Sequence, residues 1–308
     1  MKVIHAASEL EAAPRRVCLA IGVFDGIHLG HQQVIRQTIT DARQHQALSI
    51  VITFDRHPNS VVAPDRIPPL IFSLSQKLRV IASLGVEATL LIRFDRAFSE
   101  QSGERFVRDL ARDFREIHSI CVGSDFTFGH RRTGNIALLK NLGQELRFAV
   151  RSLAAVSLDG TTVSSTRIRE AVRQGDLDAA SQMLGRAYSI AGPVVKGDQL
   201  GGQLGFPTAN LDVAGLVLPP DGVYAAHARV QENSFSAVRN IGLRPTLQDS
   251  APQRRFEVHL LDFNADIYGQ EIEVAFVEKL RDEQKFPSIE ALRAQISRDT
   301  AAARQLLG

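Results

Sequence analysis

The amino-acid sequence predicts an α/β domain followed by an antiparallel all-β domain, because the hydrophobic pattern changes midway along the chain. In the first half, near-continuous apolar runs alternate with helical patterns, as in a parallel sheet covered on both faces. In the second half, short strand-like runs are separated by turns such as "PPDG", which is typical of an antiparallel sandwich or barrel. We expect the boundary near residue 186, so that the domains cover residues 1–185 and 186–308.

The strands expected in the first half are apolar runs separated by helical stripes. One stripe begins at Val34, and a second is opened by an N-cap at Ser75 and closed by Gly85. Sheets of this kind bind ligands at the carboxyl ends of their strands. The expected strands cover residues 17–24, 47–54, 88–94 and 117–123, and the stripes comprise Val34, Ile35, Thr38, Ile39 and Ala42, and Leu78, Ile81 and Leu84.

The second half contains strand-like runs at short intervals and a single helical pattern at its end. That helix is expected from about Ser288, with Ile289, Leu292 and Ile296 on one face. The expected strands cover residues 188–195, 222–230, 235–242, 256–263 and 272–280.

Composition and charge exclude several classes of protein. The 308 residues suffice for about two domains, and 44% hydrophobic and 23% charged residues are ordinary for a soluble globular protein. A net charge of +2 gives no indication of a nucleic-acid partner, and no apolar run approaches the ~20 residues that span a bilayer. Cys18 and Cys121 have no metal-ligand spacing and form no disulfide framework. We expect a cytoplasmic protein without a membrane partner; the sequence does not indicate its oligomeric state.

The stretch "GVFDGIHLGH" places two histidines on a glycine-rich turn between an expected strand and an expected helix. Gly22 and Gly30 let backbone N–H groups approach an anion, and the helix N-terminus adds a partial positive charge. His28 and His31 are three residues apart, so both imidazoles face one side of the first turn. They suit a phosphate whose negative charge grows during displacement. Two solvated histidines are the alternative, and zinc is disfavoured because no carboxylate or thiol stands at metal-ligand spacing.

A second polar stretch, "VSSTRIREAV", precedes another helical run. The hydroxyls of Ser164, Ser165 and Thr166 can cap this helix or bind phosphate. Arg167 and Arg169 add guanidinium groups that match phosphate geometry. On its own, this stretch is better explained as a plain helix cap followed by solvated arginines.

A third stretch, "KGDQLGGQLGFPTANL", is a glycine-rich loop in the second half. Its glycines allow backbone N–H groups to wrap phosphates, although the Walker A ending is missing. Thr208 and Asn210 offer two hard oxygens for Mg²⁺ beside a nucleotide. Glu257 stands on an expected strand, where a surface carboxylate is the simpler interpretation of the strand alone. The loop glycines are Gly197, Gly201, Gly202 and Gly205.

These motifs together resemble one family. "GVFDGIHLGH" resembles the HxGH signature of the nucleotidyltransferase superfamily, and within it the FMN adenylyltransferase half of bacterial bifunctional FAD synthetases, whose second module is riboflavin kinase. The remaining matches occur in order along nearly the whole chain: "TFDRHP", "VGSDFTFG" and "VSSTRIREAV" in the first module, and "GFPTANL", "PPDGVYAA", "NIGLRPTL", "EVHLLDF" and "LRDEQKF" in the second.

The resemblance implies a Rossmann-like nucleotidyltransferase domain that joins FMN to the α-phosphorus of ATP and releases pyrophosphate. His28 and His31 would stabilise the transition state, and Asp125, Phe126 and Phe128 would contact the flavin. Phenylalanines at this spacing are also common in cores. The positions implied for ATP and its phosphates are Gly22, Phe24, Asp25, Gly30, Ser164, Ser165, Thr166, Arg167 and Arg169.

For the second half, the resemblance implies an antiparallel β-barrel with a closing helix that phosphorylates riboflavin. Glu257 matches the family's catalytic base, Thr208 and Asn210 would hold Mg²⁺, and Gly197, Gly201 and Gly205 would bind ATP. The expected substrates are therefore ATP, riboflavin and FMN. Four positions depart from the family pattern, namely Asn135, Gly202, Arg239 and Leu243.

These departures leave alternatives open. One is an FMN adenylyltransferase whose kinase module is degenerate and only binds flavin. Another is a non-catalytic flavin carrier, although a binder has no need of His28, His31, Asn210 and Glu257. A nucleotidyltransferase acting on a different phosphate monoester is compatible with the HxGH stretch alone, and the barrel motifs disfavour it.

Overall fold

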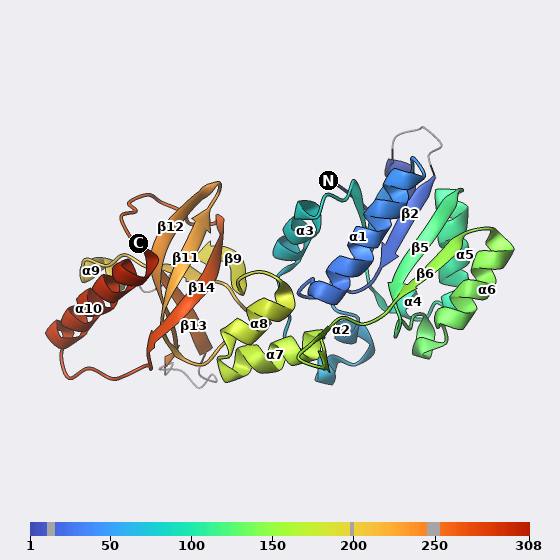
Figure 1. Cartoon of the computed structure of the whole chain (residues 1–308). Coiled ribbons are helices and arrows are strands. Elements are labelled where there is room, and N and C mark those ends of the chain that lie inside the picture. The colour runs from blue at the N-terminus through green and yellow to red at the C-terminus, as the bar shows by residue number, and fades with distance from the viewer. Residues whose placement is uncertain (11–15, 198–199, 245–252) are drawn as a thin grey trace. The chain divides into compact units, whose positions relative to one another are not determined.

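A computed structural model describes the chain from residue 1 to 308, except for residues 11–15, 198–199 and 245–252 (Figure 1). The chain divides into two compact units. The first contains Met1–Leu70 and Leu74–Arg167, and the second contains Ile71–Ser73 and Ile168–Gly308. In the described parts of the chain, no helix is both long enough and apolar enough to cross a membrane.

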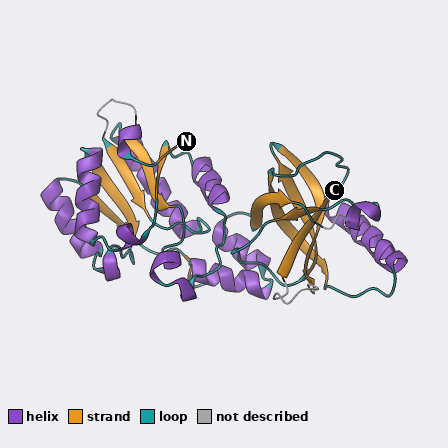
Figure 2. Ribbon diagram, turned by 180° about the vertical axis from the view of Figure 1, so that it is seen from behind, coloured by secondary structure: helices purple, strands orange, loops and turns teal. Residues whose placement is uncertain are grey.

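The first unit is built on a parallel sheet of six strands in the order β1-β4-β3-β2-β5-β6. Helices cover both faces of this sheet, as Figure 2 shows. The α/β class predicted from the sequence is confirmed. The strands are β1 (Lys2–Ile4), β2 (Val17–Ile21), β3 (Leu48–Phe54), β4 (Ala88–Ile92), β5 (Ile117–Gly123) and β6 (Ala149–Leu153).

Alternate residues of each central strand enter different cores. Leu19 and Ile21 of β2 pack in a cluster with Phe106 and Leu110, whereas Ala20 between them packs in a second cluster with α1. Because both faces are buried, the strand is apolar at every position and shows no alternation. This explains the near-continuous apolar run seen in the sequence.

The helices and short elements of the first unit include several that the sequence analysis did not predict, among them α5, α6 and the hairpin β7–β8. The predicted N-cap at Ser75 is wrong, because α3 already begins at Leu74. The elements are α1 (Leu29–Gln44), α2 (Asn59–Val62), α3 (Leu74–Ser83), α4 (Arg96–Ser99), α5 (Gly103–Phe114), α6 (Ile136–Leu146), the 3-10 turns η1 (Ala7–Glu9), η2 (Pro64–Arg66) and η3 (His130–Arg132), and the strands β7 (Ser157–Leu158) and β8 (Thr161–Thr162).

The second unit is a closed antiparallel barrel, in the strand order β10-β13-β12-β11-β14-β9, and pairing of β10 with β9 closes it. The strand pattern alone left a sandwich open, and the barrel that the family resemblance implies is confirmed. The elements are α7 (Ser165–Gln174), α8 (Leu177–Leu184), β9 (Ser189–Val195), α9 (Leu200–Gln203), β10 (Ala209–Leu211), β11 (Gly222–Val230), β12 (Asn233–Arg244), β13 (Gln253–Leu260), β14 (Glu271–Arg281) and α10 (Ile289–Leu307).

Two predicted strands differ from those observed by three residues at one end or both, for a local reason in each case, and the other predicted strands that are observed agree to within two residues. The expected strand 17–24 stops at Ile21, because Phe24 adopts a φ of 52° in the following turn. The expected strand 256–263 begins three residues earlier and ends at Leu260, since its first residues pair with β12 and Asp262 has a φ of 56°.

The closing helix α10 lies along the outside of the barrel (Figure 1). Ala303 packs with Val223, Ala225 and Val238 of the barrel wall. The helix begins after Ser288, at the start that the sequence predicted. The Ser288 hydroxyl accepts the N–H of Ala291 at 3.2 Å and caps the helix.

The chain passes between the two units at α7, since Arg167 belongs to the first unit and Ile168 to the second. Helices α7 and α8 precede the barrel, and the predicted boundary at residue 186 lies in the link between α8 and β9. The first strand of the barrel starts directly after it, at Ser189.

Candidate active sites

The first candidate site is the turn that joins β2 to α1. His28 is the N-cap of α1, and its Nδ1 atom accepts the backbone N–H of His31 at 3.4 Å. The two imidazole rings are stacked, with centroids 3.6 Å apart and planes inclined by 21°. His28 is 7% exposed, and so is Asp25. The expectation that both rings face the same side of the helix start is therefore met by the geometry.

The backbone of this turn is held in an unusual conformation. Phe24 and Ile27 have φ values of 52° and 42°, a backbone conformation that residues other than glycine rarely adopt. A Cβ atom at Gly22 would meet the Phe24 ring at 2.9 Å, and one at Gly30 would meet the His28 ring at 3.3 Å. These glycines therefore make room for the two rings of the motif. The Phe24 ring in turn packs edge-on against His31, at 5.2 Å between centroids.

The hydroxyl-rich stretch at the start of α7 lies beside this turn. Ser165 Oγ donates a hydrogen bond to the carbonyl oxygen of Asp25 at 3.0 Å. Ser164 Oγ accepts the backbone N–H of Arg167 at 3.2 Å, which caps the helix. Thr166 is exposed. Two segments about 140 residues apart in sequence thus meet at the carboxyl edge of the sheet, where ligands bind in folds of this class.

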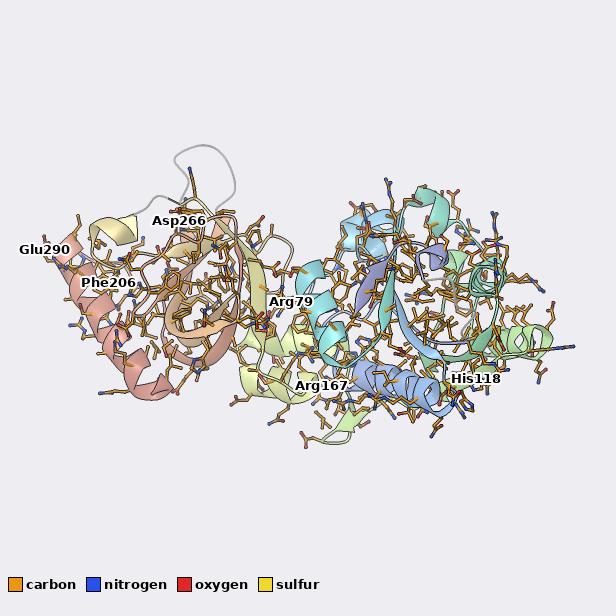
Figure 3. The ribbon with its side chains drawn as sticks, turned by 90° about the horizontal axis from the view of Figure 1, so that it is seen from above. Arg79, His118, Arg167, Phe206, Asp266 and Glu290 are labelled. Carbon is orange, nitrogen blue, oxygen red and sulfur yellow. The ribbon has the colours of Figure 1, made fainter. Side chains whose placement is uncertain are left out.

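The two arginines of this stretch differ. Arg167, labelled in Figure 3, donates from Nη1 to the carbonyl oxygens of Leu158 and Thr161 in the β7–β8 hairpin, at 3.4 and 3.0 Å. Arg169 is 7% exposed and belongs to the second unit. Phosphate binding by either arginine stays a prediction.

The residues expected to contact flavin follow β5. Asp125 is exposed, and the rings of Phe126 and Phe128 are stacked with centroids 5.1 Å apart. Phe128 also packs closely on Gly134, where an added Cβ would lie 2.7 Å from its ring. Phe128 therefore contributes to the core, and its contact with flavin stays a prediction. Asn135, one of the four departures, accepts the N–H of Leu138 at 3.0 Å and caps α6.

The second candidate site is a pocket of about 270 Å³ between the outer face of the barrel and α10. Asn210 of β10 lies opposite Glu257 of β13, and Glu257 lies opposite Asn240 of β12. These three side chains therefore form a row across adjacent strands, and all three line the pocket together with Thr208. Strand pairing alone brings together residues that are far apart in sequence.

The glycine-rich loop packs directly on this row. A Cβ atom at Gly197 would collide with the amide of Asn210, and one at Gly201 would meet the hydroxyl of Thr208 at 3.0 Å. Gly205 has a φ of 86°, which favours glycine. The loop glycines thus allow the backbone to approach the oxygens predicted to bind Mg²⁺.

The wall opposite the barrel is anchored by a buried ion pair. Arg281 at the end of β14 donates to both carboxylate oxygens of Asp299 in α10, at 3.0 and 2.8 Å. Asp299 is 5% exposed, so this pair fixes α10 against the pocket with little solvent screening. The helix contributes Leu292 and Ile296 to the lining.

Several lining residues were not predicted from the sequence. The period-2 pattern of the strands offered a signal, because positions 255, 257 and 259 share one face of β13, as do 238 and 240 on β12. The unpredicted lining residues include Phe206, Asn240, Arg255, His259, Arg281, Glu283, Phe286 and Asp299.

Two of the three departures in the second half, Arg239 and Gly202, do not fill this pocket. Arg239 points into the barrel interior, is fully buried, and has its guanidinium carbon 3.6 Å from the centroid of the Phe276 ring. Burial lowers the pKa of Arg239 well below its usual value. A side chain at Gly202 would meet open space. The side chain of Leu243 and the rest of its motif, residues 245–247, lie outside the described residues.

The second site offers neutral oxygens as ligands for a metal ion. Among the residues that the structure describes, no group of three or more His, Cys, Asp and Glu side chains is arranged to hold a metal ion. Thr208 and Asn210 supply hard oxygens beside Glu257. Such a set fits Mg²⁺, which is commonly held by few protein ligands together with substrate phosphates and water.

Comparison with protein families assigns a class to each half of the chain. Residues 10–167 match the model of FAD synthetase, and residues 184–307 match the model of riboflavin kinase. The fold and the two sites therefore define a two-module protein with an α/β nucleotidyltransferase unit and a flavokinase barrel.

Relatives match the chain along its whole length. The bifunctional riboflavin kinase/FMN adenylyltransferase of Escherichia coli (strain K12) is 38% identical over 100% of this chain and 98% of the relative, and that of Haemophilus influenzae is 35% identical over 99% and 98%. A crystal structure of a protein described as a macrolide-efflux protein from Streptococcus pneumoniae has a TM-score of 0.81 and 30% identity, over 98% of both chains. The chain belongs to the family of bifunctional riboflavin kinases/FMN adenylyltransferases.

Proposed function

We propose that this chain phosphorylates riboflavin to FMN at the barrel and adenylylates FMN to FAD at the HxGH turn, with ATP and Mg²⁺. The observation that carries the proposal is the coexistence of two separately assembled sites in one chain. His28 and His31 are stacked at a helix start, and Asn210 and Glu257 are paired across two strands. Relatives with both activities in their names align over the full length.

At the first site, the reaction is an attack of the FMN phosphate on the α-phosphorus of ATP, with pyrophosphate as the leaving group. No protein nucleophile takes part, so positioning and charge stabilisation supply the rate enhancement. His28 and His31 face the growing charge, and the N-terminus of α1 adds its partial positive charge. Ser165 holds the turn through the carbonyl of Asp25.

At the second site, Glu257 accepts the proton of the riboflavin 5′-hydroxyl as that oxygen attacks the γ-phosphate of ATP. Thr208 and Asn210 would hold Mg²⁺, which neutralises charge on the phosphates when bound. The loop glycines let backbone N–H groups approach the phosphates, and Asn240 completes the row beside Glu257. We assign riboflavin to the pocket under α10.

The inward direction of Arg239 supports an active kinase over a degenerate one, because the substitution leaves the pocket lining unchanged. The free, buried thiols of Cys18 and Cys121 support a reducing compartment such as the cytoplasm.

A time course tests the proposal. The chain is incubated with riboflavin, ATP and Mg²⁺, and riboflavin, FMN and FAD are separated at intervals. FMN should appear first and FAD should follow. Conversion of added FMN to FAD without any FMN formation from riboflavin would favour the degenerate kinase, and binding without turnover would favour a flavin carrier.

We also propose that residues 186–308 form a domain that folds alone. This fragment contains all six barrel strands and α10. It should convert riboflavin to FMN and make no FAD. A fragment that unfolds, while one that also includes α7 and α8 is folded, would move the boundary to the start of α7.

A further inference from the structure

Lys77 lies in the first turn of α3. Its side chain is buried, which is rare for lysine. It is 8% exposed, although an ammonium group normally stays in water. Burial lowers the pKa of Lys77 to about 8, and the carboxylates of Asp25 and Asp55 oppose this shift. The amine has no part in the chemistry described above.

The buried amine has three hydrogen-bond acceptors, which is the number that an ammonium group can serve. Nζ donates to the carbonyl oxygen of Phe54 at 2.8 Å, to Thr53 Oγ1 at 3.2 Å and to the carbonyl oxygen of Val23 at 3.5 Å. Thr53 Oγ1 itself donates to the Val23 carbonyl at 3.0 Å. Lys77 therefore joins the end of β3 to the turn after β2.

That turn is the one that leads to His28. Val23 precedes Phe24, whose positive φ is unfavourable, and such a conformation persists only where its surroundings hold it. Lys77 and Thr53 hold the carbonyl of Val23, whereas Ser165 holds the carbonyl of Asp25. The turn is thus held at the carbonyls of Val23, Asp25 and Ile27, the last of which accepts from Gln32 Nε2 at 3.0 Å, and Lys77 supplies a charged contact.

We propose that Lys77 is a positioning residue of the adenylyltransferase site, where its ammonium group holds the turn before His28 in the conformation that adenylyl transfer requires. The inference rests on the proposed function of that turn. All three N–H donors of the ammonium group are engaged by the protein, so it acts through the turn and leaves the substrate to His28 and His31.

The test measures FAD formation from FMN and ATP between pH 6.5 and 9.5 for the full chain. Lys77→Met keeps the length of the side chain and removes its charge and donors. Its kcat should fall by about 10²-fold, the scale expected when reacting groups are misplaced, while KM changes little. Lys140→Met, which replaces an exposed lysine of the same unit, is the matched control and should behave like the wild type.

The pH profile separates positioning from general stability. In the wild type, kcat should decline above about pH 8, because the neutral amine has one N–H donor fewer than the ammonium group. Lys77→Arg keeps its charge at these pH values and should lack this decline, whereas Lys77→Met should be slow at every pH. FMN formation from riboflavin, measured on the same samples, should stay unchanged and reports on folding.

The outcomes distinguish this proposal from the function on which it rests. If His28→Ala slows FAD formation but Lys77→Met has wild-type kcat and pH profile, Lys77 has no positioning role and the proposed function stands. If His28→Ala is also without effect, both are overturned. Thr53→Val removes the hydroxyl between the amine and Val23, and carries the test if Lys77→Met does not fold; an unchanged kcat for it would count against the proposal.

Discussion

The two candidate sites of this chain are assembled in different ways. The first is centred on one continuous stretch, Gly22–His31, whose backbone conformation and helix start bring its rings together. The second is a row of side chains from three strands, in which Asn210 and Glu257 are opposite each other only because β10 pairs with β13. A local site depends on backbone conformation, whereas a site assembled across strands depends on register.

The two sites should also differ in how far the effect of a substitution extends to neighbouring residues. A change in the turn affects the conformation of its neighbours, as the contacts of Gly22 with Phe24 and of Gly30 with His28 indicate. A change in the strand row removes one functional group, since each strand is held by its own backbone pairing. Substitutions at the two sites should therefore separate the two activities.

The largest effect is expected from Glu257→Gln. The variant keeps the shape and the strand pairing but removes the proton acceptor, so kcat for FMN formation should fall by about 10² to 10⁴-fold. Riboflavin binding and FAD formation from added FMN should persist. The control is Glu278→Gln on strand β14 of the same barrel, which does not pair with β13 and where the side chain is exposed. Near-normal kinase turnover in Glu257→Gln would exclude the proposed base.

His28→Ala should lower the kcat for FAD formation by about 10² to 10³-fold, the loss expected for one transition-state donor. His28 is also the N-cap of α1, so His28→Asn serves as a control that keeps a capping side chain. Both variants should be slow if the imidazole is needed for the reaction. Recovery in His28→Asn would mean that only the helix cap matters.

Asn210→Ala should have a smaller effect, about tenfold, expressed as a higher Mg²⁺ or ATP requirement, because one hard oxygen among several ligands is removed. Titration of Mg²⁺ at saturating riboflavin measures it. If excess Mg²⁺ leaves the loss in rate unchanged, Asn210 contributes to the alignment of Glu257 and the metal assignment is wrong.

Arg239→Met should stabilise the barrel, because it removes a buried charge. Replacing buried ion pairs by apolar side chains of similar volume stabilises proteins by about 1 to 4 kcal/mol, and we expect a gain of this order. No nitrogen of this guanidinium has a hydrogen-bond partner among the described residues. Contacts with the rings of Tyr224, Phe256 and Phe276 oppose the gain. Calorimetry of the full chain measures it, and the kinase rate should be unaffected. A lower melting temperature would show that these ring contacts outweigh the cost of burial.

The smallest effect is expected at His118, which is labelled in Figure 3. Burial, and then the charge of the neighbouring His45 imidazole, whose ring centroid is 3.7 Å away, lower the pKa of His118 below its usual value of 6.5. The unfolded chain therefore binds the proton more readily, and the native state loses stability as the pH falls below about 6.5. His118→Gln should reduce this acid sensitivity of the melting temperature. An equal slope against pH in both proteins would rule out the contribution.

Strong, repetitive patterns made much of the fold predictable. The central strands of the first unit are apolar at nearly every position because both faces are buried, and in the barrel strand β14 buried residues alternate with partly exposed ones along its first half. Shorter or more polar elements were missed, as β10 has only three residues and β6 is largely exposed. Helix α5 was missed although its pattern predicts a helix. Ser102 is an N-cap, and the helical face that follows it is apolar, with Phe106, Val107, Leu110 and Phe114.

The sequence by itself determined the two-part organisation, the strand-rich barrel half, and the HxGH turn, because each of these depends on residues close together in the chain. Only the tertiary structure decided that Asn240 joins the row of Asn210 and Glu257 and that Arg239 points inward, and it confirmed the barrel that the family resemblance implied. It also revealed Lys77, whose acceptors are backbone carbonyls and a threonine on other elements. Strand register and hydrogen bonds to backbone carbonyls do not require particular residue types. They therefore could not be predicted from a single sequence.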